Sequence, residues 1–276
     1  MEQYKKEQDK EKFYDEDVKL VENMAFLLQR CLISKRKNVE DSYEMLYQML
    51  KWRKEHRLRE ACDQDFPLEY FKCGAAFLYE PDKFGNRTLY IRSALLRSVP
   101  EMKESLKEFI AYLMYQIDDC VNGDSWAVIF DLTNTGWNNY DIDLLMHFLT
   151  LLKEYFPVNV DYVLAINFPW VLSAAWTLAK RLIPPERRDV VVFINDQEVE
   201  KFIDRENLPD FLGGTCTREH QLAPKGCPSI VEYLTTLKEP RSSHKRVREI
   251  IKTLGDVLSK EHVASLFKQL ELHDNC

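Results

Sequence analysis

Three short apolar stretches, each about as long as a single β-strand, constrain the fold of this chain more than any other feature. They are Trp126–Asp131 (WAVIFD), Val160–Asn167 (VDYVLAIN) and Val190–Ile194 (VVVFI). Segments with helical periodicity separate them, among them Asp141–Tyr155. Buried strands that alternate with helices predict an α/β fold, in which helices cover a largely parallel sheet.

The part of the chain before the first strand is predicted to be helical. Val18–Leu32 carries one apolar stripe, and a second helix is predicted to begin after Asn38. Asn38 suits the N-cap position because Asp41 follows three residues later, near the free amides of the first turn. We expect a flexible N-terminus over residues 1–14, a helical N-terminal lobe over 15–65, an α/β lobe over 66–216 and a helical C-terminal tail over 217–276.

Composition excludes several classes of protein. Of the 276 residues, 45% are hydrophobic and 30% charged, which is ordinary for a globular protein and argues against global disorder. The net charge is −7, and acidic residues interrupt the basic segments 35–37 and 51–59, so nucleic acid is not an expected partner. The N-terminal sequence MEQYKKEQDK lacks an apolar signal region, and the seven cysteines show no CxxC spacing. A reduced, cytoplasmic setting is therefore expected.

No known catalytic motif appears in the sequence. The patterns GxGxxG, GxxxxGK[ST], GxSxG and HExxH are all absent. Asp131 ends a buried strand, where it could act as an acid or could cap the next turn through the amides of Thr133 and Asn134; we favour the cap. His147 is interpreted as a packing or surface histidine. We therefore expect no enzyme, no catalytic residue, no metal and no cofactor.

The segment Trp170–Ile183 (WVLSAAWTLAKRLI) is the most unusual part of the sequence. It follows a strand inside a run of 17 uncharged residues, Val163–Ala179, which Pro169 divides and which is too short for a membrane span of about 20 residues. The predicted helix is apolar around most of its circumference. It is either a central buried helix or a lid over an apolar cavity whose outer face meets a membrane. Its tryptophans suit the membrane interface, and Lys180 and Arg181 suit anionic head groups.

The order of motifs over residues 16–216 resembles the CRAL-TRIO lipid-binding and lipid-transfer domains. The matching stretches are Arg30–Val39 (RCLISKRKNV), Trp52-Arg53, the turn Asp82–Tyr90, Asp131-Leu132, Tyr155–Pro157 with Ile166–Trp170, and Leu208–Gly214 (LPDFLGG). DLTNTGWNNYDID and INFPW are most similar to the CRAL-TRIO part of motile sperm domain-containing proteins. The resemblance implies a helical N-terminal lobe and a mixed, largely parallel sheet, flanked by helices, that encloses an apolar pocket under a gate helix at Trp170–Ile183.

The resemblance also implies where this chain departs from its family. In the phosphatidylinositol-transfer members a Glu follows the Tyr-Pro pair and a Lys begins the strand after the gate, and these positions are Val158 and Val190 here. Two hydroxyl residues that serve phosphatidylcholine correspond to Trp126 and Val128. A classical inositol/choline exchanger is therefore doubtful, and a more apolar pocket is expected. A register slip of one residue would exchange the two faces of each strand.

The site residues follow from this register. The expected pocket residues are Trp126, Val128, Phe130, Val163, Ala165 and Val190. The expected gate-helix residues are Trp170, Leu172, Trp176 and Leu178. The residues expected to contact membrane or phosphate are Lys35, Arg36, Lys180 and Arg181.

Two functions remain open at this point. The first is binding of a small hydrophobic lipid, such as a sterol, retinoid, fatty acid or phospholipid, and its transport between membranes. The second is an interaction module that docks on membranes or lipid droplets without carrying cargo. Either function predicts a cytoplasmic protein in peripheral contact with a membrane, for which the endoplasmic reticulum and lipid droplets are candidates. The C-terminal tail is a candidate surface for protein partners.

Overall fold

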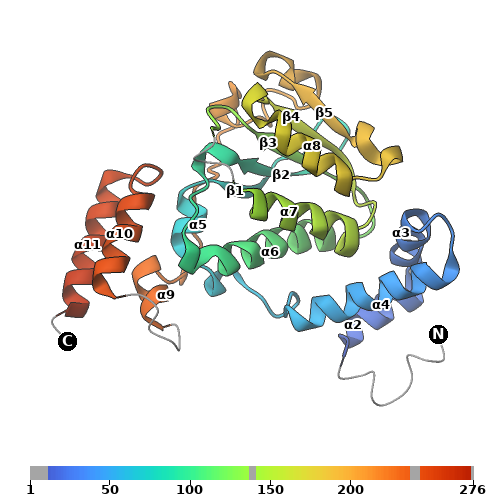
Figure 1. The fold of residues 1–276 in the computed structure, drawn as a ribbon, viewed down its shortest axis with the longest axis horizontal. Helices are drawn as coiled ribbons and strands as arrows, with labels where there is room; N and C mark the ends of the chain where they lie inside the picture. The colour runs from blue at the N-terminus through green and yellow to red at the C-terminus, as the bar shows by residue number, and fades with distance from the viewer. Residues whose placement is uncertain (1–11, 137–140, 237–242, 275–276) are drawn as a thin grey trace.

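A five-stranded sheet with helices on it forms the centre of the molecule (Figure 1). A computed structural model describes residues 12–136, 141–236 and 243–274. The longer helices are α2 (Asp15–Asn23), α3 (Phe26–Ser34), α4 (Val39–Glu55), α5 (Leu68–Lys72), α6 (Lys103–Val121), α7 (Ile142–Thr150), α8 (Ser173–Leu182), α9 (Ile230–Thr236), α10 (His244–Leu254) and α11 (Lys260–Asp274). The strands are β1 (Ala76–Tyr79), β2 (Arg87–Arg92), β3 (Trp126–Asp131), β4 (Val160–Ile166) and β5 (Val191–Ile194).

The sheet is mixed and largely parallel, as the sequence predicted. Its strands lie in the order β1-β2-β3-β4-β5. β1 runs antiparallel to β2, and the other neighbouring pairs are parallel. The parallel strands therefore end at one edge of the sheet, and the segment that leads into α8 leaves from that edge.

Alternation along β3 divides the core between the two faces of the sheet. Trp126 and Val128 point to the face that α6 covers, and Ala127 and Ile129 point to the opposite face. On that opposite face the core is completed by side chains of the segment after β5, among them Val199. Trp126 and Val128 thus share one face of β3, while the family register that made them pocket residues stays a prediction.

The N-terminal lobe has its own small core and is joined to α6 by buried charges. The predicted single helix over Val18–Leu32 is wrong: the chain breaks after Asn23, and α2 and α3 are separate helices. Arg30 of α3 and Arg53 of α4 both pair with Asp118 of α6, at 3.1 Å and 3.2 Å. The cap of α4 is confirmed, since the Asn38 side chain accepts a hydrogen bond from the amide of Asp41.

The C-terminal helices pack on the end of the sheet where β1 lies, far from the N-terminal lobe (Figure 1). Ile250 and Ile251 of α10 and Leu266 of α11 belong to the same buried cluster as Phe109 of α6. Arg246 holds this contact from outside through a pair of hydrogen bonds to the Glu101 carboxylate, at 2.6 Å and 3.1 Å.

Candidate functional site

The helix α8 lies on the surface of the molecule, with apolar side chains toward the core and a mixed outer side on which Ser173, Thr177 and Arg181 are exposed beside Leu178. Leu172, just before it, and Ala179 face inward and are 1% and 3% exposed. Trp170 and Leu178 face outward and are 85% and 42% exposed. A central buried helix, one of the two alternatives from the sequence, is thus excluded, and α8 has the position of a lid.

The turn before α8 depends on Asn167. This residue has φ +53°, a left-handed conformation that Asn tolerates better than most residues. Its side-chain amide donates a hydrogen bond to the Thr133 hydroxyl at 2.9 Å, and its carbonyl oxygen accepts one from the amide of Asp196 at 3.2 Å. The turn is therefore tied to the segments that follow β3 and β5.

A cavity of about 90 Å³ lies beneath α8, and we call it the lid cavity. It is bounded by α8, by the inner face of β3–β5 and by α7. Every residue that lines it is apolar: Phe130, Leu132, Leu145, Phe148, Leu149, Leu152, Val163, Ala165, Phe168, Leu172, Trp176, Ala179, Ile183, Val191 and Phe193. Such a lining offers no hydrogen-bonding group to a ligand and suits a hydrocarbon.

The six predicted pocket residues lie in three different places. Phe130, Val163 and Ala165 line the lid cavity. Trp126 and Val128 do not line it. They lie on the same face but nearer the start of β3, where they are fully buried in the main core. Alternation along a strand gives the face of a residue, but α6 decides how far along that face the hollow extends.

Val190, the sixth predicted pocket residue, lines a second cavity of about 120 Å³ that shares Leu149, Leu152 and Val163 with the first. This neighbour is less apolar because Ser34, Lys153 and Arg187 also border it. An Arg187 guanidinium nitrogen donates a hydrogen bond to the Val160 carbonyl oxygen at 2.8 Å. Lys153 pairs with the adjacent Glu154 at 2.7 Å.

Trp176 of α8 points inward, whereas Trp170 points outward. The Trp176 ring lines the lid cavity and packs edge-on against Phe193, with ring centroids 5.0 Å apart. The ammonium of Lys180 lies 5.5 Å from the centre of the same ring. Trp170, which lies just before α8, is therefore the tryptophan of the predicted gate segment that is exposed to meet a membrane.

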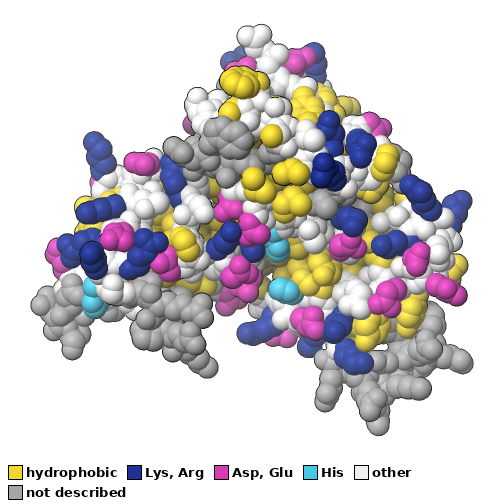
Figure 2. All heavy atoms as spheres, viewed as in Figure 1, with side chains coloured by type: hydrophobic (Ala, Val, Ile, Leu, Met, Phe, Trp, Pro, Cys, Tyr) yellow, Lys and Arg dark blue, Asp and Glu magenta, His cyan; other side chains and the backbone are white. Residues whose placement is uncertain are grey.

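Basic side chains gather over α8 on one face of the molecule, with hydrophobic side chains around them (Figure 2). Arg181 is exposed, and Arg188 donates a hydrogen bond to the Lys180 carbonyl oxygen at 3.1 Å. Lys35 and Arg36 follow α3 directly and come after Ser34, which borders the second cavity. The structure therefore brings the four predicted basic residues to the neighbourhood of the two cavities.

The wall that α7 and two phenylalanines contribute was not among the predicted pocket residues. Leu145, Phe148 and Leu152 belong to the helix that was predicted over Asp141–Tyr155, but none of them was expected to border a pocket. Phe168 and Phe193 form the opposite wall, with ring centroids 5.1 Å apart. The alternation of Phe193 within β5 is the one signal that could have indicated its position.

Other candidate groups have structural roles. The Asp131 carboxylate accepts a hydrogen bond from the amide of Thr133 at 3.0 Å, which is the predicted turn cap, and lies 3.7 Å from Arg92. His147 is half-buried, and burial lowers its pKa. Within the described ranges, His, Cys, Asp and Glu side chains nowhere gather in threes that could hold a metal ion. Among the same residues, no helix is long and apolar enough to cross a bilayer.

Comparison with known proteins decides the family. The family model of the CRAL/TRIO domain matches residues 71–214, which include the whole sheet and α8. The chain belongs to the CRAL/TRIO family. Members of this family are lipid-binding and lipid-transfer proteins.

Two curated CRAL/TRIO relatives and one solved structure illustrate the similarity. A CRAL-TRIO domain-containing protein of Schizosaccharomyces pombe is 23% identical, over 84% of this chain and 54% of its own length. Protein real-time of Drosophila pseudoobscura pseudoobscura is 26% identical, over 71% of this chain and 33% of its own. The crystal structure of Sfh5 matches with a TM-score of 0.56 and 15% identity over 83% of both chains, which shows the fold. The chain spans about a third to a half of these curated relatives.

Proposed function

We propose that this protein binds a small hydrophobic lipid in the lid cavity and exchanges it with membranes by movement of α8. One observation carries the proposal: an apolar cavity lies under a surface helix whose inner side is apolar and whose outer side exposes Leu178, next to the exposed Trp170 that precedes the helix. The inner side, with Leu172 and Ala179, matches a hydrocarbon ligand. The outer side, with Trp170 and Leu178, matches the interior edge of a bilayer.

Movement of α8 follows from the size of the cavity. A hollow of about 90 Å³ has room for only a few water-sized groups, so a whole lipid enters when α8 swings outward. Exposing the inner side of α8 to water would be unfavourable, at roughly 25 cal/mol per Å² of apolar surface. In contact with a membrane that surface stays in an apolar medium. The membrane therefore lowers the free energy of the open state.

Selectivity in such a cavity comes from shape. Burial of a hydrocarbon gains about 0.8 kcal/mol per CH₂ relative to water, and a bilayer gives the same gain. Extraction is therefore nearly neutral for the chain, and the ligand is chosen by how well it fits the walls. The absence of polar groups from the lining favours a sterol, retinoid or fatty acid over a phospholipid with a large polar head group.

Basic residues are placed to orient the protein on an anionic surface. Lys180 and Arg181 lie on α8 itself, and Lys35 and Arg36 lie at the end of α3. Each basic residue near an anionic membrane contributes about 1 kcal/mol to the attraction between protein and membrane.

We propose a cytoplasmic protein in peripheral contact with a membrane, with the endoplasmic reticulum and lipid droplets as candidates. The tail remains a proposed surface for protein partners.

A second candidate function is membrane recruitment without cargo. It is favoured by the small volume of the lid cavity and by the exposure of Trp170, which would serve docking alone equally well.

The closer resemblance to motile sperm domain-containing proteins also stays a prediction. Part of the motif that suggested it, residues 137–140, lies outside the described residues, as does most of the predicted flexible segment 1–14.

A liposome transfer assay distinguishes the two functions. Donor vesicles carry a fluorescent sterol, acceptor vesicles carry a quencher, and the protein is added at catalytic amounts. We expect transfer by the wild type and a loss of at least fivefold in Trp170→Asp, because the charge opposes insertion of the outer side of α8. Phe84→Asp is the control, since Phe84 is also an exposed aromatic residue, at 65%, but lies in the turn between β1 and β2. Membrane binding without transfer by the wild type would favour recruitment.

A further inference from the structure

The lid cavity is one of four hollows that follow α7 along its length. Beyond it lies a small cavity of about 30 Å³, which shares Phe130, Leu145 and Phe148 with the lid cavity as a common wall. This small cavity in turn shares Leu96 and Leu144 with a fourth hollow of about 50 Å³, which we call the far cavity. From the second cavity to the far cavity, the α7 residues on the walls lie progressively nearer the start of that helix.

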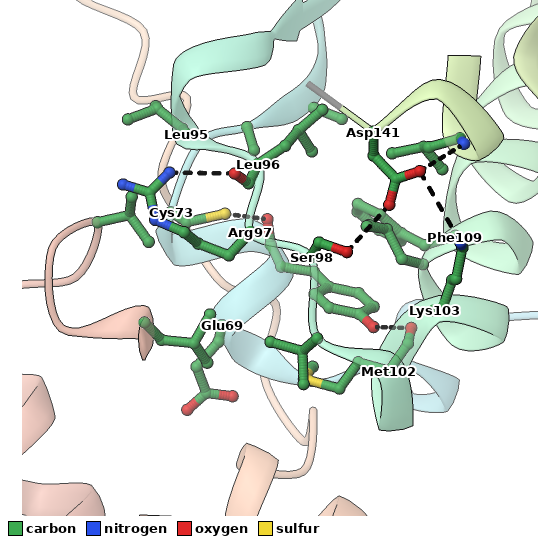
Figure 3. A pocket seen from close by; sticks show the side chains of 18 of the residues that line it. Glu69, Cys73, Leu95, Leu96, Arg97, Ser98, Met102, Lys103, Phe109 and Asp141 are labelled. Atoms are coloured by element: carbon green, nitrogen blue, oxygen red, sulfur yellow. Dashed lines mark hydrogen bonds and ion pairs between the residues drawn. The ribbon is translucent and has the colours of Figure 1, made fainter. Parts of the chain in front are cut away.

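The far cavity lies where the C-terminal tail meets the lipid-binding lobe (Figure 3). Its walls come from α5, α6, the loop before α6 and the segment between α10 and α11, and include Met102, Phe109 and Leu258. The sequence gives no sign that this hollow lies in line with the cavity under α8. The two are linked through the small cavity, which shares wall residues with each of them.

The charged and polar side chains at the rim of the far cavity already have hydrogen-bond or ion-pair partners. Figure 3 shows Asp141 beside Ser98 and Lys103, whose side chains lie 3.1 Å and 3.9 Å from its carboxylate. The Arg97 guanidinium donates hydrogen bonds to two carbonyl oxygens of its own loop, at 2.8 Å and 3.0 Å. A charged head group would have to displace these contacts. The far cavity therefore suits the methyl end of a hydrocarbon chain.

Two aromatic rings separate the lid cavity from the hollows beyond it. Phe130 on β3 and Phe148 on α7 meet at a centroid distance of 6.2 Å, with their planes inclined at 60°. Phe148 is 4% exposed and belongs to the core, whereas Phe130 is only partly buried. Both rings border the lid cavity and the small cavity, so they stand across the path between the two.

We propose that the Phe130–Phe148 pair sets the greatest length of hydrocarbon chain that the lid cavity accepts. The preferred ligand class is a lipid with one unbranched chain, whose end stops against these rings. Removal of either ring joins the lid cavity to the small cavity and so opens the path along α7 to the far cavity. This inference rests on the proposed function, since it concerns a chain already bound beneath α8.

The consequence is a change in how affinity depends on chain length. Each methylene removed from water strengthens binding about fourfold, the equivalent of about 0.8 kcal/mol. In the wild type, affinity stops rising once the hydrocarbon chain is long enough to fill the lid cavity. In a variant without one ring it continues, so a chain two methylenes longer than the wild-type limit binds roughly 15-fold more tightly than that limiting chain.

The experiment measures dissociation constants for saturated fatty acids of increasing length, for the wild type and for Phe148→Ala and Phe130→Ala. Fatty acids with a diazirine at the methyl end then report where that end lies. We expect photo-crosslinks to the walls of the lid cavity in the wild type and to Leu96 or Met102 in the variants. Leu152→Ala is the matched control, because Leu152 lines the lid cavity but not the small cavity, and its crosslinks should remain beneath α8.

The outcomes separate this inference from the proposed function. An unchanged length limit in a folded variant, or crosslinks that stay beneath α8, would overturn the inference alone. Failure of the wild type to bind any fatty acid or sterol would overturn the proposed function as well. Phe148→Ala removes a ring from the core, so this variant is the more disruptive of the two. If it does not fold, the partly exposed Phe130 position carries the test.

Discussion

Asp118 is the residue on which the attachment of the N-terminal lobe depends most. Its carboxylate is 5% exposed and pairs with Arg30 and Arg53, and it also accepts a hydrogen bond from the side chain of Asn159. Removal of one partner from a buried ion pair leaves the other charges without compensation. We expect Asp118→Ala to lower the free energy of unfolding by about 3–5 kcal/mol, measured by urea denaturation.

The neighbouring residue provides the control for this prediction. Asp119 is on the same helix but exposed, so Asp119→Ala should change the free energy of unfolding by no more than about 0.5 kcal/mol. Equal effects of the two substitutions would show that the buried pairs contribute no more than surface charge does.

Cys31 gives a second test at the same scale, because its thiol lies in the core of the N-terminal lobe. Burial raises the pKa of Cys31 to about 11, since the thiolate is disfavoured away from water. At pH 8 we expect iodoacetamide to modify the exposed Cys62 and Cys120 at least tenfold faster than Cys31, as followed by mass spectrometry. Comparable rates would mean that the small core opens readily.

The same shift predicts how stability depends on pH. A thiol whose pKa is higher in the folded than in the unfolded state stabilises the fold fully below its unfolded value, 9.0. This contribution is then lost as the pH rises from about 9 through about 11. The Cys31→Ala variant should show a smaller fall in its unfolding midpoint over this range than the wild type does.

Among the elements, the turn that leads into α8 determines where the lid begins. Asn167 has a positive φ and its side chain bonds in two directions. A β-branched residue is strained in this conformation, so we expect Asn167→Val to cost about 1–2 kcal/mol from backbone strain, and more from the lost hydrogen bonds. Asn167→Gly also loses the two side-chain hydrogen bonds, but glycine adopts a positive φ without strain. Its loss of stability should therefore be smaller than that of Asn167→Val. Urea denaturation of both variants measures the difference, and equal costs would exclude a role for the backbone conformation.

Element boundaries show where sequence reasoning is limited. The cap of α4 at Asn38 was predicted because it depends on two residues that are three apart in the sequence. The break after Asn23 was missed because no Gly or Pro marks it. The end of α7 was also missed in detail, since the predicted helix continues over Leu151–Tyr155 as a π-helical turn.

At the scale of the whole molecule, the order of strands and helices could be predicted, but the extent of the cavity could not. The register taken from the family resemblance places Trp126, Val128 and Phe130 on one face of β3, and all three side chains belong to or pack against the same buried cluster. Only Phe130 reaches the lid cavity, because α6 covers the first two residues. How far one helix extends over a sheet is a property of tertiary packing, which a single sequence does not encode in any local pattern.

The position of the C-terminal tail is also determined by tertiary packing. The sequence predicted helices there without a position for them. In the structure α10 and α11 share a buried cluster with α6 and close the far cavity through Leu254 and Leu258. The tail therefore forms part of the wall at the far end of the row of hollows along α7.

The central claim is that the lid cavity holds one apolar lipid, and native mass spectrometry of the protein purified from cells tests it most directly. Ala165→Phe is the matched variant, because Ala165 is a small, buried side chain on the floor of the cavity and a ring at this position would fill the hollow. We predict one bound lipid per wild-type molecule and none in folded Ala165→Phe. A wild-type protein that carries no lipid, or a variant that carries the same lipid in the same amount, would contradict the account.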